Sequence, residues 1–240
     1  MKFSIIGVTL MMLSGCVSGF SGTRFADTAE TKTGDVMPIF IATSRKMNGD
    51  GSVTAELSST TNYLMNLINI PKNHKTGQIE RPTFGSESRN SHFTFLSQRV
   101  LDHDRFRAEI SAQLSGRVGT ARDILVYVHG FNTGYDEARF RLAQIATDSG
   151  FTGVPVLFTW PSQNRTFAYG ADKDNATASR DDLTTVLSEL GTMPGVGRIH
   201  ILAHSMGTWL TMEALRESAI GGRGDLSGRL GEVMLAAPDI

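Results

Sequence analysis

The sequence predicts an α/β fold in which a mostly parallel sheet carries helices on both faces. Two observations predict it: strand-like apolar runs alternate with amphipathic helices after residue 123, and one of these strands enters its helix through a sharp turn with a serine at its tip. The functional residues of such sheets lie at the carboxyl ends of the strands. Functional residues are therefore expected where each predicted strand ends.

The predicted elements follow one another in a regular order. Residues 123–128 are rich in β-branched and aromatic side chains and suit a strand buried on both faces. In the next segment, Ala138, Leu142, Ile145 and Ala146 mark one face of a helix. A strand at 154–160, a helix at 183–190, a strand at 199–204, a helix at 206–219 and a strand at 232–237 complete the pattern. Residues 48–51 read as a hairpin turn. Residues 160–175 read as a polar loop, which either shapes the substrate pocket or is a plain solvated loop.

Ser205 is the predicted nucleophile. It lies between the apolar strand at 199–204 and the following helix, with the small residues Ala203 and Gly207 two positions away on either side. This arrangement is typical of a nucleophile elbow, in which strand and helix pack so closely that larger side chains would collide. The pattern usually has glycine at both small positions, so Ala203 is a departure. The alternative is a serine that caps an ordinary helix.

The strand at 123–128 ends in His129-Gly130-Phe131, which predicts half of an oxyanion hole. Esterases and lipases place a backbone N–H from such a loop beside the N–H of the residue after the nucleophile. Phe131 and Met206 would then supply the two donors. His129 and Gly130 would shape the loop, and His129 would not act as a base.

Four motifs in order resemble a family of largely uncharacterised bacterial α/β-hydrolases that are allied to esterases and lipases. The motifs are Val-Tyr-Val-His-Gly-Phe-Asn (126–132), Phe-Thr-Trp-Pro-Ser (158–162), Leu-Ala-His-Ser-Met-Gly (202–207) and Leu-Ala-Ala-Pro-Asp-Ile (235–240). Residues 39–45 fit the first strand of that family. The resemblance runs from about residue 36 to the end, and it implies the fold of a serine hydrolase without implying a substrate.

The remaining members of a catalytic triad are harder to place. A hydrolase of this type needs an acid and then a histidine after the nucleophile, but no histidine follows Ser205. Asp239 is a candidate for the acid, and a turn cap beside Pro238 is the alternative. The resemblance implies further strands and a closing helix, so we expect a C-terminally incomplete α/β-hydrolase domain at residues 36–240, with a native short form as the other possibility.

The N-terminus predicts a lipoprotein. Residues 1–15 combine a short positive start with an apolar run, and Leu13-Ser14-Gly15-Cys16 matches the box at which a bacterial lipoprotein is cleaved and lipidated. Cys16 is the single cysteine of the chain. Residues 16–35 then read as a lipidated cysteine and a flexible linker. This predicts a lipid-anchored protein of the bacterial cell envelope, and Val17 favours the outer membrane, facing the periplasm.

Composition narrows the partners. The formal net charge is −1 and the sequence has no His/Cys cluster, phosphate-binding loop or repeat, so we expect no nucleic acid, metal or cofactor. Two functions remain open. One is a serine hydrolase that acts on a carboxylic ester or related acyl compound, small or lipid-like, and the other is a non-catalytic envelope lipoprotein that uses the scaffold for binding. The substrate and the oligomeric state stay open.

Overall fold

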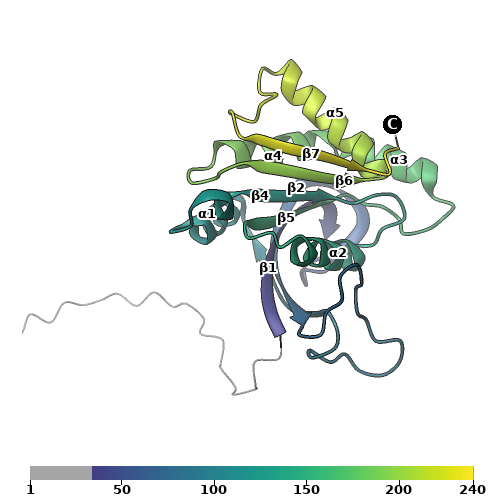
Figure 1. Cartoon of the computed structure of the whole chain (residues 1–240). Coiled ribbons are helices and arrows are strands. Elements are labelled where there is room, and N and C mark those ends of the chain that lie inside the picture. The colour runs from purple at the N-terminus through teal and green to yellow at the C-terminus, as the bar shows by residue number, and fades with distance from the viewer. Residues whose placement is uncertain (1–33, 240) are drawn as a thin grey trace, which may run out of the picture. The chain divides into compact units, whose positions relative to one another are not determined.

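The computed structural model describes residues 34–239 and contains a seven-stranded sheet with the order β3-β2-β1-β5-β4-β6-β7 (Figure 1). Strands β1, β5, β4, β6 and β7 run parallel, and the antiparallel pairs β1–β2 and β2–β3 extend one edge. The predicted α/β-hydrolase architecture with a mostly parallel sheet is confirmed. The strands are β1 (Gly34–Met47), β2 (Val53–Pro71), β3 (Thr94–Leu101), β4 (Ile124–Val128), β5 (Val154–Thr159), β6 (Ile199–His204) and β7 (Leu230–Ala236).

The helices cover the two faces of the sheet unequally. Helices α1, α3, α4 and α5 share one hydrophobic core with the sheet, whereas α2 packs into a second core on the opposite face (Figure 1). The central strands are buried on both sides, and this explains their continuous apolar sequences. The helices are α1 (His103–Leu114), the 3₁₀ turn η1 (Gly119–Arg122), α2 (Tyr135–Asp148), α3 (Tyr169–Ala178), α4 (Arg180–Thr192) and α5 (Met206–Ile220).

Two predicted boundaries need correction. The segment 160–175 was expected to be a loop, but α3 begins at Tyr169. Its sequence lacks an apolar stripe because Asp172 and Ala176 are the residues that it buries. At the other end of the chain, β1 begins at Gly34, so residues 34 and 35 of the predicted linker pair with β2. The predicted signal peptide, Cys16 and the rest of the linker lie outside the described residues.

The sheet face that carries α2 is partly open. α2 packs against β5, β2 and β1. Beyond it, Leu202 of β6 and Met234 of β7 line an open, largely apolar cavity of about 560 Å³ together with Phe151. Met234 is 41% exposed. An apolar strip of β6 and β7 therefore meets solvent, which a parallel sheet normally avoids.

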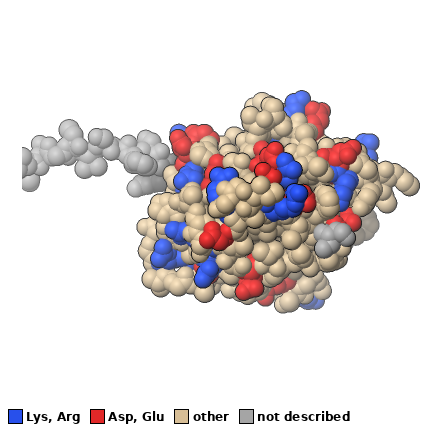
Figure 2. Space-filling view, turned by 90° about the horizontal axis from the view of Figure 1, so that it is seen from above, with Lys and Arg blue, Asp and Glu red and all other residues tan. Residues whose placement is uncertain are grey.

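Figure 2 shows Lys and Arg side chains interspersed with Asp and Glu on the face seen from above, in keeping with the formal net charge of −1. No helix among residues 34–239 has the length and apolar character that crossing a bilayer requires.

A histidine held between two carboxylates joins the loop after β2 to the end of α2. Nδ1 of His74 lies 2.9 Å from Glu80 and Nε2 lies 2.8 Å from Asp148. Burial by itself would lower the pKa of His74, but the two carboxylates outweigh burial and raise it, and the pKa values of Glu80 and Asp148 are lowered. The His74 contribution to stability is therefore lost as pH rises through its raised pKa. The carboxylate contributions are lost as pH falls below about 4.

We expect His74→Gln to reduce the free energy of unfolding by about 1 kcal/mol at pH 6 and by clearly less at pH 9, because the contribution of a raised histidine pKa is lost as pH rises. Urea unfolding at the two pH values measures the difference. His103→Gln is the matched control, because His103 also contacts a carboxylate, Glu189, but is exposed. An equal loss for His74→Gln at both pH values would contradict the charge-based account.

Candidate active site

Ser205 occupies a strained turn between β6 and α5. Its φ is +50°, a region that non-glycine residues rarely adopt. The turn is held on both sides: the Ser205 N–H donates to the carbonyl of Ala236 in β7 at 2.9 Å, and its carbonyl accepts from the Thr208 N–H at 2.8 Å. The Ser205 side chain is half-buried at the carboxyl end of the sheet.

Two glycines let neighbouring segments approach this turn. A Cβ at Gly207 would lie 2.4 Å from the carbonyl oxygen of His129, and a Cβ at Gly130 would lie 2.8 Å from Cβ of Ser205. Neither position can hold a larger side chain without a shift of the backbone. Ala203, where the usual pattern has glycine, is fully buried, and its methyl group is accommodated.

The backbone donors predicted for an oxyanion hole lie beside the turn. Phe131 follows Gly130, which contacts Ser205. Among the residues that the structure describes, no acceptor takes a hydrogen bond from the Phe131 N–H. Met206 is the first residue of α5, where helix geometry leaves the N–H without a partner in the helix and the helix dipole is positive. Two N–H groups are thus available for an anion next to Ser205.

His129 is fully buried behind this loop and cannot serve as a base. Its Nδ1 lies 2.9 Å from the carbonyl oxygen of Gly130, and its Nε2 lies 2.9 Å from Oγ1 of Thr159. The ring stacks on Trp160 with 5.0 Å between centroids. Burial lowers the pKa of His129 to about 3, and the nearby Arg45 guanidinium acts in the same direction. The ring is therefore neutral at ordinary pH, and both nitrogens are engaged.

The other histidines do not reach the nucleophile. In residues 34–239, Oγ of Ser205 forms no hydrogen bond with any histidine. His200 accepts from the Glu232 N–H at 3.1 Å and lies 3.5 Å from Asp123. His204 is exposed and lines a separate cavity of about 310 Å³ with Tyr127 and Leu202. The described site holds a serine on a strained turn and two backbone N–H groups beside it, but none of its histidines is placed as a base.

Asp239 lies at the carboxyl end of β7, as the sequence predicts, and binds a tyrosine. Its carboxylate accepts a hydrogen bond from the Tyr169 hydroxyl at 2.8 Å, which raises the pKa of Tyr169. The Asp239 N–H donates to Oγ1 of Thr208 at 3.1 Å. The Tyr169 ring packs edge-on against Phe131, with 5.4 Å between centroids. An aromatic bridge thus runs from the oxyanion loop to Asp239.

Sequence reasoning missed several of these residues. Tyr169 lies in a segment that was expected to be a loop, and a lone tyrosine in a polar stretch carries no signal. The segments recognised by resemblance include Arg45, Thr159 and Ser162. Nothing in the spacing of these residues indicates that Arg45 is hydrogen-bonded to the other two.

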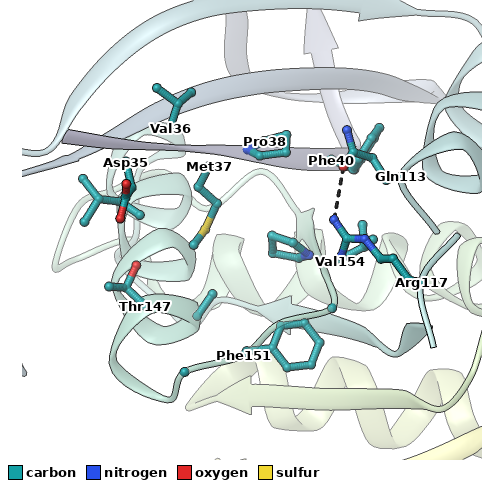
Figure 3. Close-up of a pocket in the computed structure, with 15 residues that line it drawn as sticks. Asp35, Val36, Met37, Pro38, Phe40, Gln113, Arg117, Thr147, Phe151 and Val154 are labelled. Atoms are coloured by element: carbon teal, nitrogen blue, oxygen red, sulfur yellow. Dashed lines mark hydrogen bonds between the residues drawn. The ribbon is translucent and has the colours of Figure 1, made fainter. Parts of the chain in front are cut away.

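The cavity in Figure 3 lies at the opposite end of the sheet. It has a volume of about 380 Å³ and is lined by Met37, Phe151 and Val154 near the amino ends of β1 and β5. At its rim the Arg117 guanidinium donates to the Gln113 side chain. Because active sites of parallel sheets lie at the carboxyl ends, this cavity is separate from the Ser205 site. The described part of the chain contains no group of three or more His, Cys, Asp or Glu side chains that could hold a metal ion.

Residues 102–240, more than half of the chain, match the model of a protein family described as "Alpha/beta hydrolase of unknown function (DUF900)". A search of curated proteins finds no match.

Proposed function

The chain belongs to this family of α/β-hydrolases, and on that premise we propose that it is a serine hydrolase that cleaves a carboxylic ester or related acyl compound. The observation that carries the proposal is the turn at Ser205, with its φ of +50° and its contact with Gly130. A serine that only caps a helix has ordinary extended backbone geometry. The strained turn instead presents the hydroxyl above the sheet, as an elbow does.

In the proposed reaction, Oγ of Ser205 attacks the substrate carbonyl carbon and its proton passes to a base. The N–H groups of Phe131 and Met206 would bind the oxyanion, because fixed backbone dipoles need no reorganisation as charge develops. Collapse of the tetrahedral intermediate releases the alcohol and leaves an acyl-enzyme, which water then hydrolyses. The base is not among the described hydrogen-bond partners of Ser205.

We further propose that the acyl group is apolar. Phe131 and Tyr169 form an aromatic wall beside the oxyanion loop, and Phe167, two residues before Tyr169, is fully exposed. Aromatic side chains beside the loop that would bind the oxyanion favour an aliphatic or lipid-like acyl chain over a charged one. A series of p-nitrophenyl esters of increasing chain length would measure this preference.

The test of the proposed function is covalent labelling with a fluorophosphonate probe, followed by peptide mass spectrometry. Modification of Ser205 is expected, since phosphonylation displaces fluoride by the same activated serine and uses the same site for a negatively charged oxygen as acyl transfer does. A probe bound to a different serine would contradict the assignment.

A non-catalytic binding protein is the second candidate. Two observations favour it: no described histidine is hydrogen-bonded to Ser205, and the Asp239 carboxylate is bound to Tyr169. This function predicts saturable binding of an acyl compound without turnover or phosphonylation.

We also propose that Cys16 carries a lipid anchor that holds the domain in the bacterial envelope. Its support is the sequence around the single cysteine, which lies outside the described residues. Cys16→Ser is expected to move the protein from the membrane fraction to the soluble fraction or to leave the precursor uncleaved. Unchanged fractionation and processing in cell extracts would exclude this anchor. Ser14→Ala, two residues before Cys16, is the control.

A further inference from the structure

A buried chain of hydrogen bonds lies behind the loop that carries Phe131. It begins at Arg45, at the end of β1, whose side chain is only 2% exposed. The Arg45 Nε–H donates to Oγ1 of Thr159 at 3.0 Å. The terminal nitrogens donate to the carbonyls of Thr133, Ser162 and Thr54, at 3.1, 3.3 and 3.4 Å. A buried cation costs free energy unless its donors are satisfied, and these bonds satisfy the guanidinium. They also join the end of β1 to the loop after β4, which holds Thr133, and to the loop after β5, which holds Ser162.

The Gly130 carbonyl can only accept, so the bonds around His129 have a fixed direction. A guanidinium can only donate, so the Thr159 hydroxyl accepts from Arg45, and its own proton is free to point toward Nε2 of His129. The Trp160 N–H, which also can only donate, points at the same Nε2 at 3.2 Å. Nε2 is therefore the acceptor of the ring. In a neutral imidazole the proton is then on Nδ1, which donates to the Gly130 carbonyl at 2.9 Å.

That last bond sets the orientation of the next peptide group. The Gly130 carbonyl and the Phe131 N–H belong to one trans peptide unit, in which C=O and N–H point in opposite directions. Because the carbonyl faces His129, the Phe131 N–H must face away from it.

The next two N–H groups of the same loop already have partners. Asn132 donates to Asp172 at 3.5 Å and Thr133 donates to Oγ of Ser162 at 3.2 Å. Ser162 in turn donates to Asp172 at 2.6 Å. Of these three consecutive groups in the described structure, Phe131 alone keeps a free N–H, beside the turn at Ser205.

We propose that Arg45 and Thr159 are positioning residues that lock His129 as the Nδ1–H tautomer and thereby aim the Phe131 N–H at the oxyanion. Neither residue touches the substrate, since both are buried behind the loop. This inference rests on the proposed function, because it assigns a task in the reaction of Ser205.

Three variants of the full chain test the proposal. Thr159→Val removes the hydroxyl with little change of volume, and Thr159→Ser keeps it. Thr184→Val removes a buried hydroxyl of α4 whose partners, the carbonyls of Arg180 and Ala214, are not part of this chain of bonds. The measurement is the rate of phosphonylation by the fluorophosphonate against probe concentration, at a temperature where circular dichroism shows every variant folded.

Thr159→Val is expected to lower the maximal labelling rate about tenfold or more, with the half-saturating probe concentration unchanged. Loss of a whole oxyanion donor costs about 10²- to 10³-fold, and misorientation costs part of that. Thr159→Ser should stay within about threefold of the wild type, and Thr184→Val should be unchanged. Equal maximal rates for Thr159→Val and the wild type would overturn the positioning role, as would a loss by Thr159→Ser as large as that by Thr159→Val.

The tautomer of His129 gives a readout that does not depend on activity. Long-range ¹H–¹⁵N NMR of the wild type should show a neutral ring with the proton on Nδ1 between pH 5 and pH 8. A proton on Nε2 would overturn the proposal. Failure of the wild type to be labelled at all would instead overturn the proposed function, so the two failures are distinguishable.

Discussion

Ser205→Ala is expected to abolish phosphonylation and all serine-dependent hydrolysis of a p-nitrophenyl ester. Oγ of Ser205 is the atom that the turn presents beside the N–H groups of Phe131 and Met206, and alanine deletes only that atom. Activity should fall to the background that the oxyanion donors and binding alone provide, since loss of a triad nucleophile costs several orders of magnitude. The free energy of unfolding should change by less than about 1 kcal/mol, because the backbone geometry is retained.

The matched control is Ser218→Ala, on the same helix α5. Ser218 is buried and its hydroxyl has no hydrogen-bond partner among the described residues, so its loss should leave labelling intact. Labelling that persists in Ser205→Ala would sink the assignment of the nucleophile.

Gly207→Ala is expected to be strongly destabilising for a change of one methyl group. The new Cβ would lie 2.4 Å from the His129 carbonyl oxygen and 2.7 Å from that of Val128, and both are backbone atoms of the β4 end. They cannot rotate away, so β4 and α5 must separate. We expect a loss of about 3 kcal/mol in the free energy of unfolding and, in the protein that remains folded, loss of labelling at Ser205.

Gly221→Ala, at the other end of α5, controls for the glycine change itself. Gly221 has a φ of −75°, and the nearest atom to its new Cβ would be 3.5 Å away, an ordinary contact. That variant should be as stable as the wild type within about 0.5 kcal/mol. Guanidinium unfolding compares the two, and near-native stability and labelling in Gly207→Ala would disprove the close packing at the elbow.

Among the parallel strands, β4 and β5 could be predicted because they are buried on both faces and read as continuous apolar runs. β2 escaped prediction, since its first half is rich in Ser and Thr and its strand state depends on pairing with β1 and β3. The turn at residues 48–51 was the local signal of that pairing. α3 was missed for a similar reason, because a buried Asp172 replaces the apolar stripe that marks a helix.

The candidate site likewise contains residues that could be predicted from the sequence and contacts that could not. Ser205, Gly130 and Gly207 are readable because close packing restricts the size of the side chain at each position. The bond from Arg45 to Thr159 joins residues 114 positions apart, and that from Thr159 to His129 joins residues 30 apart. No local pattern encodes such bonds, because only the strand order brings the ends of β1, β5 and β4 together.

On the ribosome, β6 and α5 emerge before β7. The Ser205 N–H finds its acceptor in Ala236, which is made thirty-one residues later. Until β7 pairs with β6, the hydrogen bond to Ala236 cannot offset the unfavourable backbone angle at Ser205. The growing chain can therefore relax the turn into ordinary helix or strand geometry. The serine of a nascent chain would thus remain unreactive until β7 pairs with β6, although the strands from β1 to β6 had already been made.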